Sequence, residues 1–174
     1  AETEWRMIVA AYPGYRSGWR GLGQVLLKQN RAGEVRELAE KLQADARTKT
    51  DGRLLSARVA ESEQAFDKAI RALQKAASDS PDDLDVHHEL CRLLFERGLP
   101  TDAVAALERL VELDPSDAAA WHNLGTAHLR CGNYERAVAL LRESLRLRPE
   151  SLHTRQELER ALDQLGPSTV KHHR

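Results

Sequence analysis

The sequence repeats at a spacing of 34 residues, and this period limits the chain to folds built from stacked copies of one small unit. Pro81, Pro115 and Pro149 are 34 residues apart, and Pro13 lies two such periods before Pro81. Leucines, small residues and glycines recur at the same spacing. A fixed period of this length is typical of repeat arrays, in which each unit buries its apolar face against its neighbours.

Each period carries the pattern of two amphipathic helices. From Trp121 to His128, apolar and small residues follow the spacing i, i+3, i+4, i+7 of one helix face. Gly132 is suited to end this helix in a left-handed conformation, and Asn133 to begin the next helix. Pro149 stops the second helix. Since no stretch alternates as a half-buried strand does, we expect an all-α fold.

This pattern resembles the tetratricopeptide repeat (TPR), which reads W-x2-L-G-x2-Y, then A-x3-F, then P. One unit matches it with Trp121, Leu124, Gly125, Ala137, Leu141 and Pro149. The resemblance implies a right-handed α-solenoid of antiparallel helix pairs, the TPR superhelix. The unit that begins near Thr50 is weaker, because Gln64 stands where the turn glycine belongs.

The period also predicts the borders of the units. We expect the second helix of a truncated repeat at 1–14, full repeats at 16–49, 50–83, 84–117 and 118–151, a capping helix at 152–166 and a disordered tail at 167–174. A polar last helix would close the apolar end of the array. The sequence begins inside a repeat, so we expect it to be part of a larger protein.

The charge balance and the cysteines exclude several classes of protein. The 26 basic and 27 acidic residues nearly cancel, which predicts no binding to nucleic acid or to a membrane surface. No apolar run is long enough to span a membrane. Two cysteines do not form a disulfide framework, so a cytoplasmic protein is the expectation. The resemblance to TPR regions of bacterial glycosyltransferases implies a bacterial origin.

Histidine and cysteine cluster in two first helices, where they could hold a metal ion. His87 and Cys91 are spaced i, i+4, and His128 and Cys131 are spaced i, i+3. The TPR pattern explains His87, Cys91 and His128 as residues in packing positions, and we favour that interpretation. No nucleophile, phosphate-binding or metalloprotease motif is present. We therefore expect no enzyme activity, metal or cofactor.

The resemblance implies a concave groove lined by the first helices of successive repeats. The groove residues carried over are Arg20, Gln24, Leu54, Arg58, His88, Arg92, Phe95, His122, Asn123, Thr126 and Arg130. They form a mildly basic stripe with apolar spots, which would suit a protein or peptide ligand with acidic and apolar residues. The alternative is that these arginines only keep the helices soluble. A clamp for chaperone tails is disfavoured, because only Asn123 matches it and Glu157 has the wrong sign.

Three functions are consistent with these sequence features. The first is a non-catalytic protein–protein interaction module that holds an extended peptide or a partner helix. The second is an accessory region of a larger enzyme, for example a glycosyltransferase, that recruits its protein substrate or mediates oligomerisation. The third is self-assembly through the open N-terminal end, where Trp5, Ile8 and Tyr12 are expected to be exposed.

Overall fold

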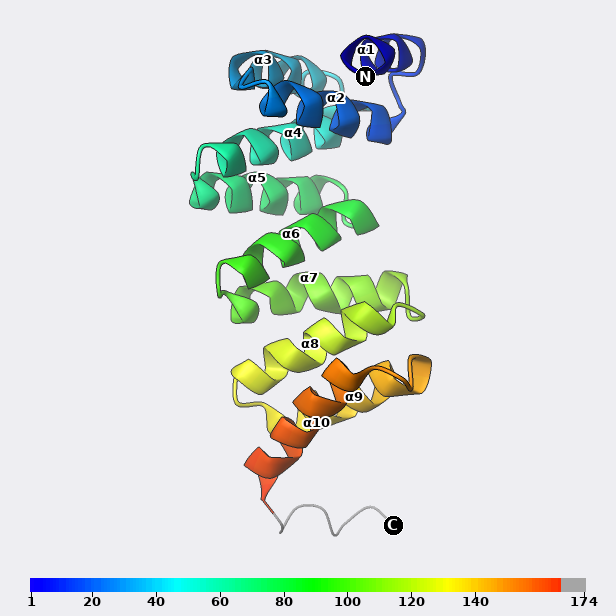
Figure 1. The fold of residues 1–174 in the computed structure, drawn as a ribbon, viewed down its shortest axis with the longest axis vertical. Coiled ribbons are helices and arrows are strands. Elements are labelled where there is room, and N and C mark those ends of the chain that lie inside the picture. The colour runs from blue at the N-terminus through cyan, green and yellow to red at the C-terminus, as the bar shows by residue number, and fades with distance from the viewer. Residues whose placement is uncertain (167–174) are drawn as a thin grey trace. The chain divides into compact units, whose positions relative to one another are not determined.

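The computed structural model describes residues 1–166, and these form ten α-helices and no β-strand (Figure 1). The helices are α1 (Glu2–Ala11), α2 (Arg16–Lys28), α3 (Ala32–Gln43), α4 (Lys49–Ser62), α5 (Phe66–Asp79), α6 (Leu84–Glu96), α7 (Pro100–Leu113), α8 (Ala118–Arg130), α9 (Tyr134–Leu147) and α10 (Leu152–Leu165). The chain is an all-α helical-repeat solenoid, as the period predicts. The tail expected at 167–174 lies outside the described residues.

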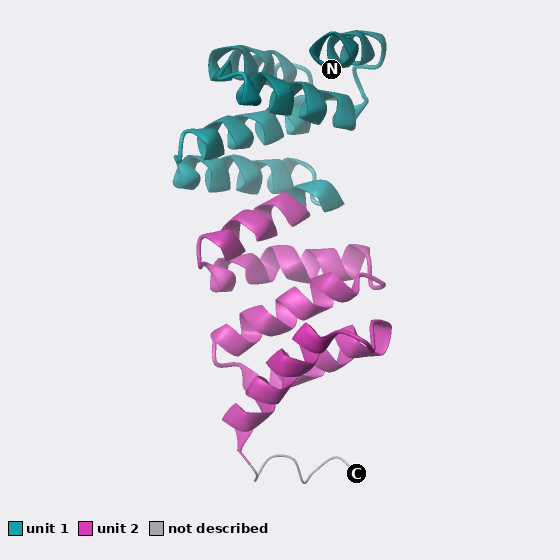
Figure 2. Cartoon of the chain, viewed as in Figure 1, with its two compact units in different colours: residues 1–86 teal, residues 87–174 magenta. Residues whose placement is uncertain are grey.

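The chain consists of two compact units, residues 1–86 and residues 87–174 (Figure 2). The core of unit 1 joins residues of α1 to α4, with Leu22, Val35 and Leu55 almost fully buried. In unit 2, Ala137 and Leu141 of α9 pack with residues of α10. Each unit therefore has an apolar core of its own.

Helices α2, α4, α6, α8 and α10 are each followed, within two residues, by a residue with positive φ. These residues are Asn30, Gln64, Gly98, Gly132 and Gly166, with φ between 58° and 78°. After the first four of them, the next amide donates to a carbonyl five residues back, as Ala65 does to Ala60 (2.8 Å) and Asn133 to His128 (2.9 Å). This is the Schellman bond pattern, which requires a left-handed residue. The role predicted for Gly132 is confirmed, and Gln64 adopts the same conformation.

Asn133 stands at the N-cap position of α9, but its side chain does not cap the helix. The side-chain nitrogen Nδ2 of Asn133 lies 3.3 Å from Nδ1 of His128 instead. The expected cap is therefore replaced by a contact with the end of the preceding helix.

The periodic prolines and small residues have structural roles that explain their spacing. The indole of Trp19 donates to the carbonyl of Pro13 (2.6 Å), and that of Trp121 to the carbonyl of Pro115 (2.9 Å). A Cβ atom added to Gly125 would lie 2.7 Å from Cγ of Leu141. Glycine at this position lets α8 and α9 approach closely.

Candidate functional site

The predicted groove residues of unit 2 lie on α6 and α8. His122, Thr126 and Arg130 are four residues apart on α8, so they share one face of that helix. The guanidinium carbon of Arg130 lies 5.9 Å from the ring centroid of Phe95 on α6, within cation–π range. Arg130 is exposed and makes no ion pair within residues 1–166, and Phe95 is half-buried. We call Phe95, Asn123 and Arg130 the unit 2 face.

The other predicted basic residues of unit 2 already have acidic partners. Arg92 donates to Glu89 (3.0 Å) and to Glu96 (2.9 Å) on its own helix. His88 Nε2 lies 3.9 Å from a carboxylate oxygen of Asp117. The fold therefore leaves this stripe less basic than the count of arginines predicts.

Burial separates two further groove residues from solvent. Thr126 is 7% exposed and Leu54 is 8% exposed. The Thr126 hydroxyl makes no hydrogen bond within the described part of the chain. Asn123 is half-buried, so a ligand can reach it more readily than it can reach these two.

His122 contacts α10, a relationship that the sequence pattern did not predict. Its ring centroid lies 4.9 Å from that of His153, and its Nδ1 lies 3.1 Å from the Thr154 hydroxyl. Burial, and then His153, lower the pKa of His122, while Glu157 acts in the opposite direction. The sequence does contain one sign of this contact, a second histidine at position 153, near the start of α10.

In unit 1, Arg20 of the predicted groove likewise has an acidic partner. Arg20 donates to Asp85 (2.8 Å), Gln24 is exposed and Arg58 is half-buried. Arg16, which is outside the predicted groove set, bonds to Asp51 (2.6 Å) and to Asp83. Arg16 and Arg20 therefore pair with carboxylates of their own unit.

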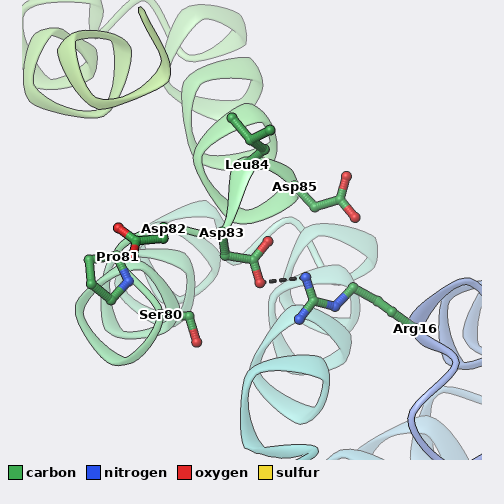
Figure 3. Close-up of a pocket in the computed structure, with 7 residues that line it drawn as sticks. All are labelled: Arg16, Ser80, Pro81, Asp82, Asp83, Leu84 and Asp85. Carbon is green, nitrogen blue, oxygen red and sulfur yellow. Dashed lines mark hydrogen bonds and ion pairs between the residues drawn. The ribbon is translucent and has the colours of Figure 1, made fainter. Parts of the chain in front are cut away.

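Arg16 borders a pocket of about 570 Å³ in unit 1. The other lining residues are Ser80, Pro81, Asp82, Asp83, Leu84 and Asp85. Figure 3 shows the Arg16 guanidinium directed at the Asp83 carboxylate. Burial is the main influence on the Asp51 carboxyl and raises its pKa, and Arg16 opposes that effect. The pocket wall is acidic, which does not fit the acidic ligand expected from the arginine count.

A second pocket, of about 760 Å³ and largely apolar, lies at the end of α1. Its lining includes Ile8, Tyr12 and Tyr15, and Tyr12 is 68% exposed. Trp5 differs from the expectation, because it is half-buried and packs against the core of unit 1. The exposed apolar surface of this end is therefore shifted toward Tyr12 and Tyr15.

The described histidines and cysteines do not form a metal-binding cluster. No group of three or more His, Cys, Asp or Glu side chains within residues 1–166 is arranged to hold an ion. Burial raises the pKa of the Cys91 thiol to about 12, and His128 is 5% exposed. None of the described helices is both long and apolar enough to cross a bilayer.

Comparisons with known proteins agree with this architecture. The chain is 31% identical over 162 residues to the protein O-mannosyl-transferase TMTC1 of Mus musculus, covering 90% of this chain and 17% of that protein. The chain thus spans about a sixth of the length of this curated relative.

Solved structures of low identity share the fold. The MamA RS-1 ArsTM double mutant superposes with a TM-score of 0.68 at 16% identity, over 87% of this chain and 85% of that one. YrrB, described as a TPR protein with an unusual peptide-binding site, gives 0.61 at 17% identity, over 91% and 81%. The first TPR of Spaghetti (RPAP3), bound to the HSP90 peptide SRMEEVD, gives 0.54 at 19% identity, over 63% and 86%.

The family comparison covers more than half of the sequence. The sequence profile of the tetratricopeptide repeat matches residues 60–127 and 94–158. With the period, the left-handed helix ends and the paired helices, this match shows that the chain belongs to the tetratricopeptide repeat family.

Proposed function

We propose that the chain is a non-catalytic protein-interaction module whose unit 2 face binds an extended peptide with acidic and apolar residues. The observation that carries this proposal is the exposed Arg130, which lies over Phe95 and has no ion pair within the described residues. A guanidinium can donate two parallel hydrogen bonds to one carboxylate, and an aromatic ring offers apolar surface beside it. Asn123 adds an amide that can bond to a peptide backbone.

Two of the proteins with a similar fold support this function. YrrB is described as having a peptide-binding site, and the Spaghetti domain is bound to SRMEEVD. That peptide combines glutamate and aspartate with methionine and valine, the composition we propose for the ligand here. The repeat borders expected from the period place Phe95 and Arg130 in the first helices of consecutive repeats.

Fluorescence anisotropy with two pools of labelled nonapeptides tests the proposal. One pool combines Asp and Glu with Leu and Phe, and the other replaces the acidic residues by Lys. We expect binding of the acidic pool only, and a loss of about tenfold, or 1.4 kcal/mol, in the Arg130→Gln variant. The matched control is Arg92→Gln, because Arg92 already bonds to Glu89 and Glu96.

Two results would contradict the proposed peptide-binding site. Equal binding of both pools would exclude recognition of acidic residues. Equal losses in the Arg130→Gln and Arg92→Gln variants would show a general charge effect instead of a site at Arg130.

A second candidate is that the chain is an accessory region of a larger transferase. The similarity to an O-mannosyl-transferase over 90% of this chain favours it. In the full-length protein, deleting residues 1–166 should lower transfer to the protein substrate and leave transfer to a short acceptor peptide unchanged. Loss of both activities would assign the region a structural role. A bacterial origin and a cytoplasmic location stay predictions.

An accessory region can also mediate oligomerisation, and we propose the N-terminal pocket as the surface through which two copies of this chain would associate. The exposed apolar residues Tyr12 and Tyr15 favour it. Light scattering over a hundredfold range of concentration should then detect a dimer that Tyr12→Ser weakens. A monomer at every concentration would exclude it.

A further inference from the structure

The N-terminal end of α10 meets α8 at a pair of imidazole rings. The ring centroids of His122 and His153 are 4.9 Å apart, with the planes tilted by 40°. His122 is half-buried and His153 is exposed. Two neutral rings can pack at this distance, whereas two imidazolium ions would repel each other in a site partly shielded from water.

A chain of hydrogen bonds joins the cap of α10 to His122. The Thr154 amide donates to the Ser151 hydroxyl (3.3 Å), which lies 2.8 Å from the Thr154 hydroxyl. The Thr154 hydroxyl, in a residue only 2% exposed, lies 3.1 Å from Nδ1 of His122. A neutral imidazole can accept at Nδ1, so each hydroxyl can donate toward the ring. Protonation makes Nδ1 a donor, and the Thr154 hydroxyl then has to accept from the ring and turn its own hydrogen away from it.

The electrostatic surroundings of His122 also disfavour a proton on its ring. His153 lies in the first turn of α10, and the N-terminus of a helix carries a partial positive charge. Burial and His153 lower the pKa of His122 from its ordinary value of 6.5. The opposing carboxylate, Glu157, accepts a hydrogen bond from Arg160 at 2.7 Å.

The charged groups on the other helices around α8 are engaged elsewhere. Glu108 of α7 and Arg136 of α9 pair with each other at 2.7 Å and act on His128, at the opposite end of α8. His88 of α6 lies near Asp117, before the start of α8. After burial, the groups that shift the pKa of His122 are thus His153 and Glu157, both on α10.

We propose that the contact of His122 with His153 and Thr154 is a pH-sensitive latch, which holds α10 on α8 while the His122 imidazole is neutral and releases it as that ring gains a proton. Release would uncover the apolar side of α10, where Ala161 is fully buried and Leu158, Leu162 and Leu165 pack against the core of unit 2. The latch is independent of the proposed function, because it concerns the docking of one helix and not a ligand.

The direction of the pH effect follows from proton linkage. A docked state with a depressed histidine pKa binds fewer protons than the released state. The contribution to docking is therefore complete above the ordinary pKa of 6.5 and is lost as the pH falls below it. At pH 5.5, complete exclusion of one proton would raise the opening equilibrium of α10 by about tenfold, which is the upper limit of the effect.

Hydrogen exchange of the α10 amides at pH 7.5 and 5.5, corrected for intrinsic exchange rates, tests the latch. Wild-type protection in α10 should fall relative to that in α7 at the lower pH, by at most about tenfold. The His122→Gln variant keeps an acceptor that cannot be protonated, so the fall should disappear. His153→Gln, at an exposed position, should reduce the fall and serves if His122→Gln loosens α10 at both pH values.

His88→Gln is the matched control, because it removes an exposed histidine outside the contact. It should behave as the wild type does. The latch is refuted if wild-type protection of α10 does not change between the two pH values. It is also refuted if the change is as large in both the His122→Gln and His153→Gln variants, or if it disappears in His88→Gln.

Discussion

Replacing Gln64 by glycine should stabilise the protein, although it removes a side chain. Gln64 has a φ of 58°, in the position that glycine occupies at 98, 132 and 166. Its side chain is exposed and makes no hydrogen bond within the described residues, so the substitution breaks no hydrogen bond. The left-handed conformation costs an ordinary L-residue about 1–2 kcal/mol.

The gain is reduced by the larger entropy of glycine in the unfolded chain, about 0.4–1 kcal/mol. The net increase in the free energy of unfolding should thus be about 0.5–1 kcal/mol, which corresponds to a rise of about 1–4 °C in Tm for a chain of this size. Asn30→Gly should change little, because asparagine tolerates φ values such as the 58° of Asn30.

Urea unfolding followed by circular dichroism and by tryptophan fluorescence measures the change. Two probes are needed because repeat arrays can depart from two-state unfolding. Gly98→Ala is the reciprocal control: its added Cβ would meet nothing within 4 Å, so any loss of stability comes from the backbone at φ 70°. An unchanged or lower midpoint for Gln64→Gly, or no loss for Gly98→Ala, would refute the importance of left-handed residues at these helix ends.

Three further predictions concern packing, a buried charge and the thiols. Gly125→Ala should destabilise the protein by about 1–2 kcal/mol in thermal unfolding, since its Cβ would lie 2.7 Å from a buried leucine and 3.2 Å from a backbone nitrogen. Arg16→Met should cost about 1–3 kcal/mol at pH 7, a value reduced for the one-third exposed guanidinium. Because burial raises the pKa of Asp51, that loss should shrink as the pH falls toward 4 and the carboxyl gains a proton; a constant loss would contradict this role. A disulfide reagent should modify the half-buried Cys131 in the native protein and spare Cys91, whose thiol pKa is about 12; two fast-reacting thiols would contradict the burial of Cys91.

Much of the fold could be predicted from the period alone. The recurrence of prolines and small residues every 34 positions identifies paired helices, because each such position repeats one local backbone or packing requirement. Position 125 requires glycine because a Cβ atom would clash with Leu141, and position 132 favours glycine because its φ is positive. The conformation of Gln64 was less evident, because its residue type gives no sign of a left-handed backbone.

The candidate site was harder to predict, since the type of a residue does not reveal its partner. Arg20, Arg92 and Arg130 look alike in the sequence, yet the first bonds to Asp85, the second to Glu89 and Glu96, and the third lies over Phe95. Likewise, the sequence placed His122 on a groove face, and only the fold joins it to α10.

Local sequence accounts for the helices, their ends and the family, because these depend on periodicity and on the backbone needs of single residues. The tertiary structure decides which arginines pair with a carboxylate and which helix His122 contacts. The physical reason is that an ion pair or hydrogen bond forms over about 3 Å, between groups as far apart in the chain as Arg20 and Asp85.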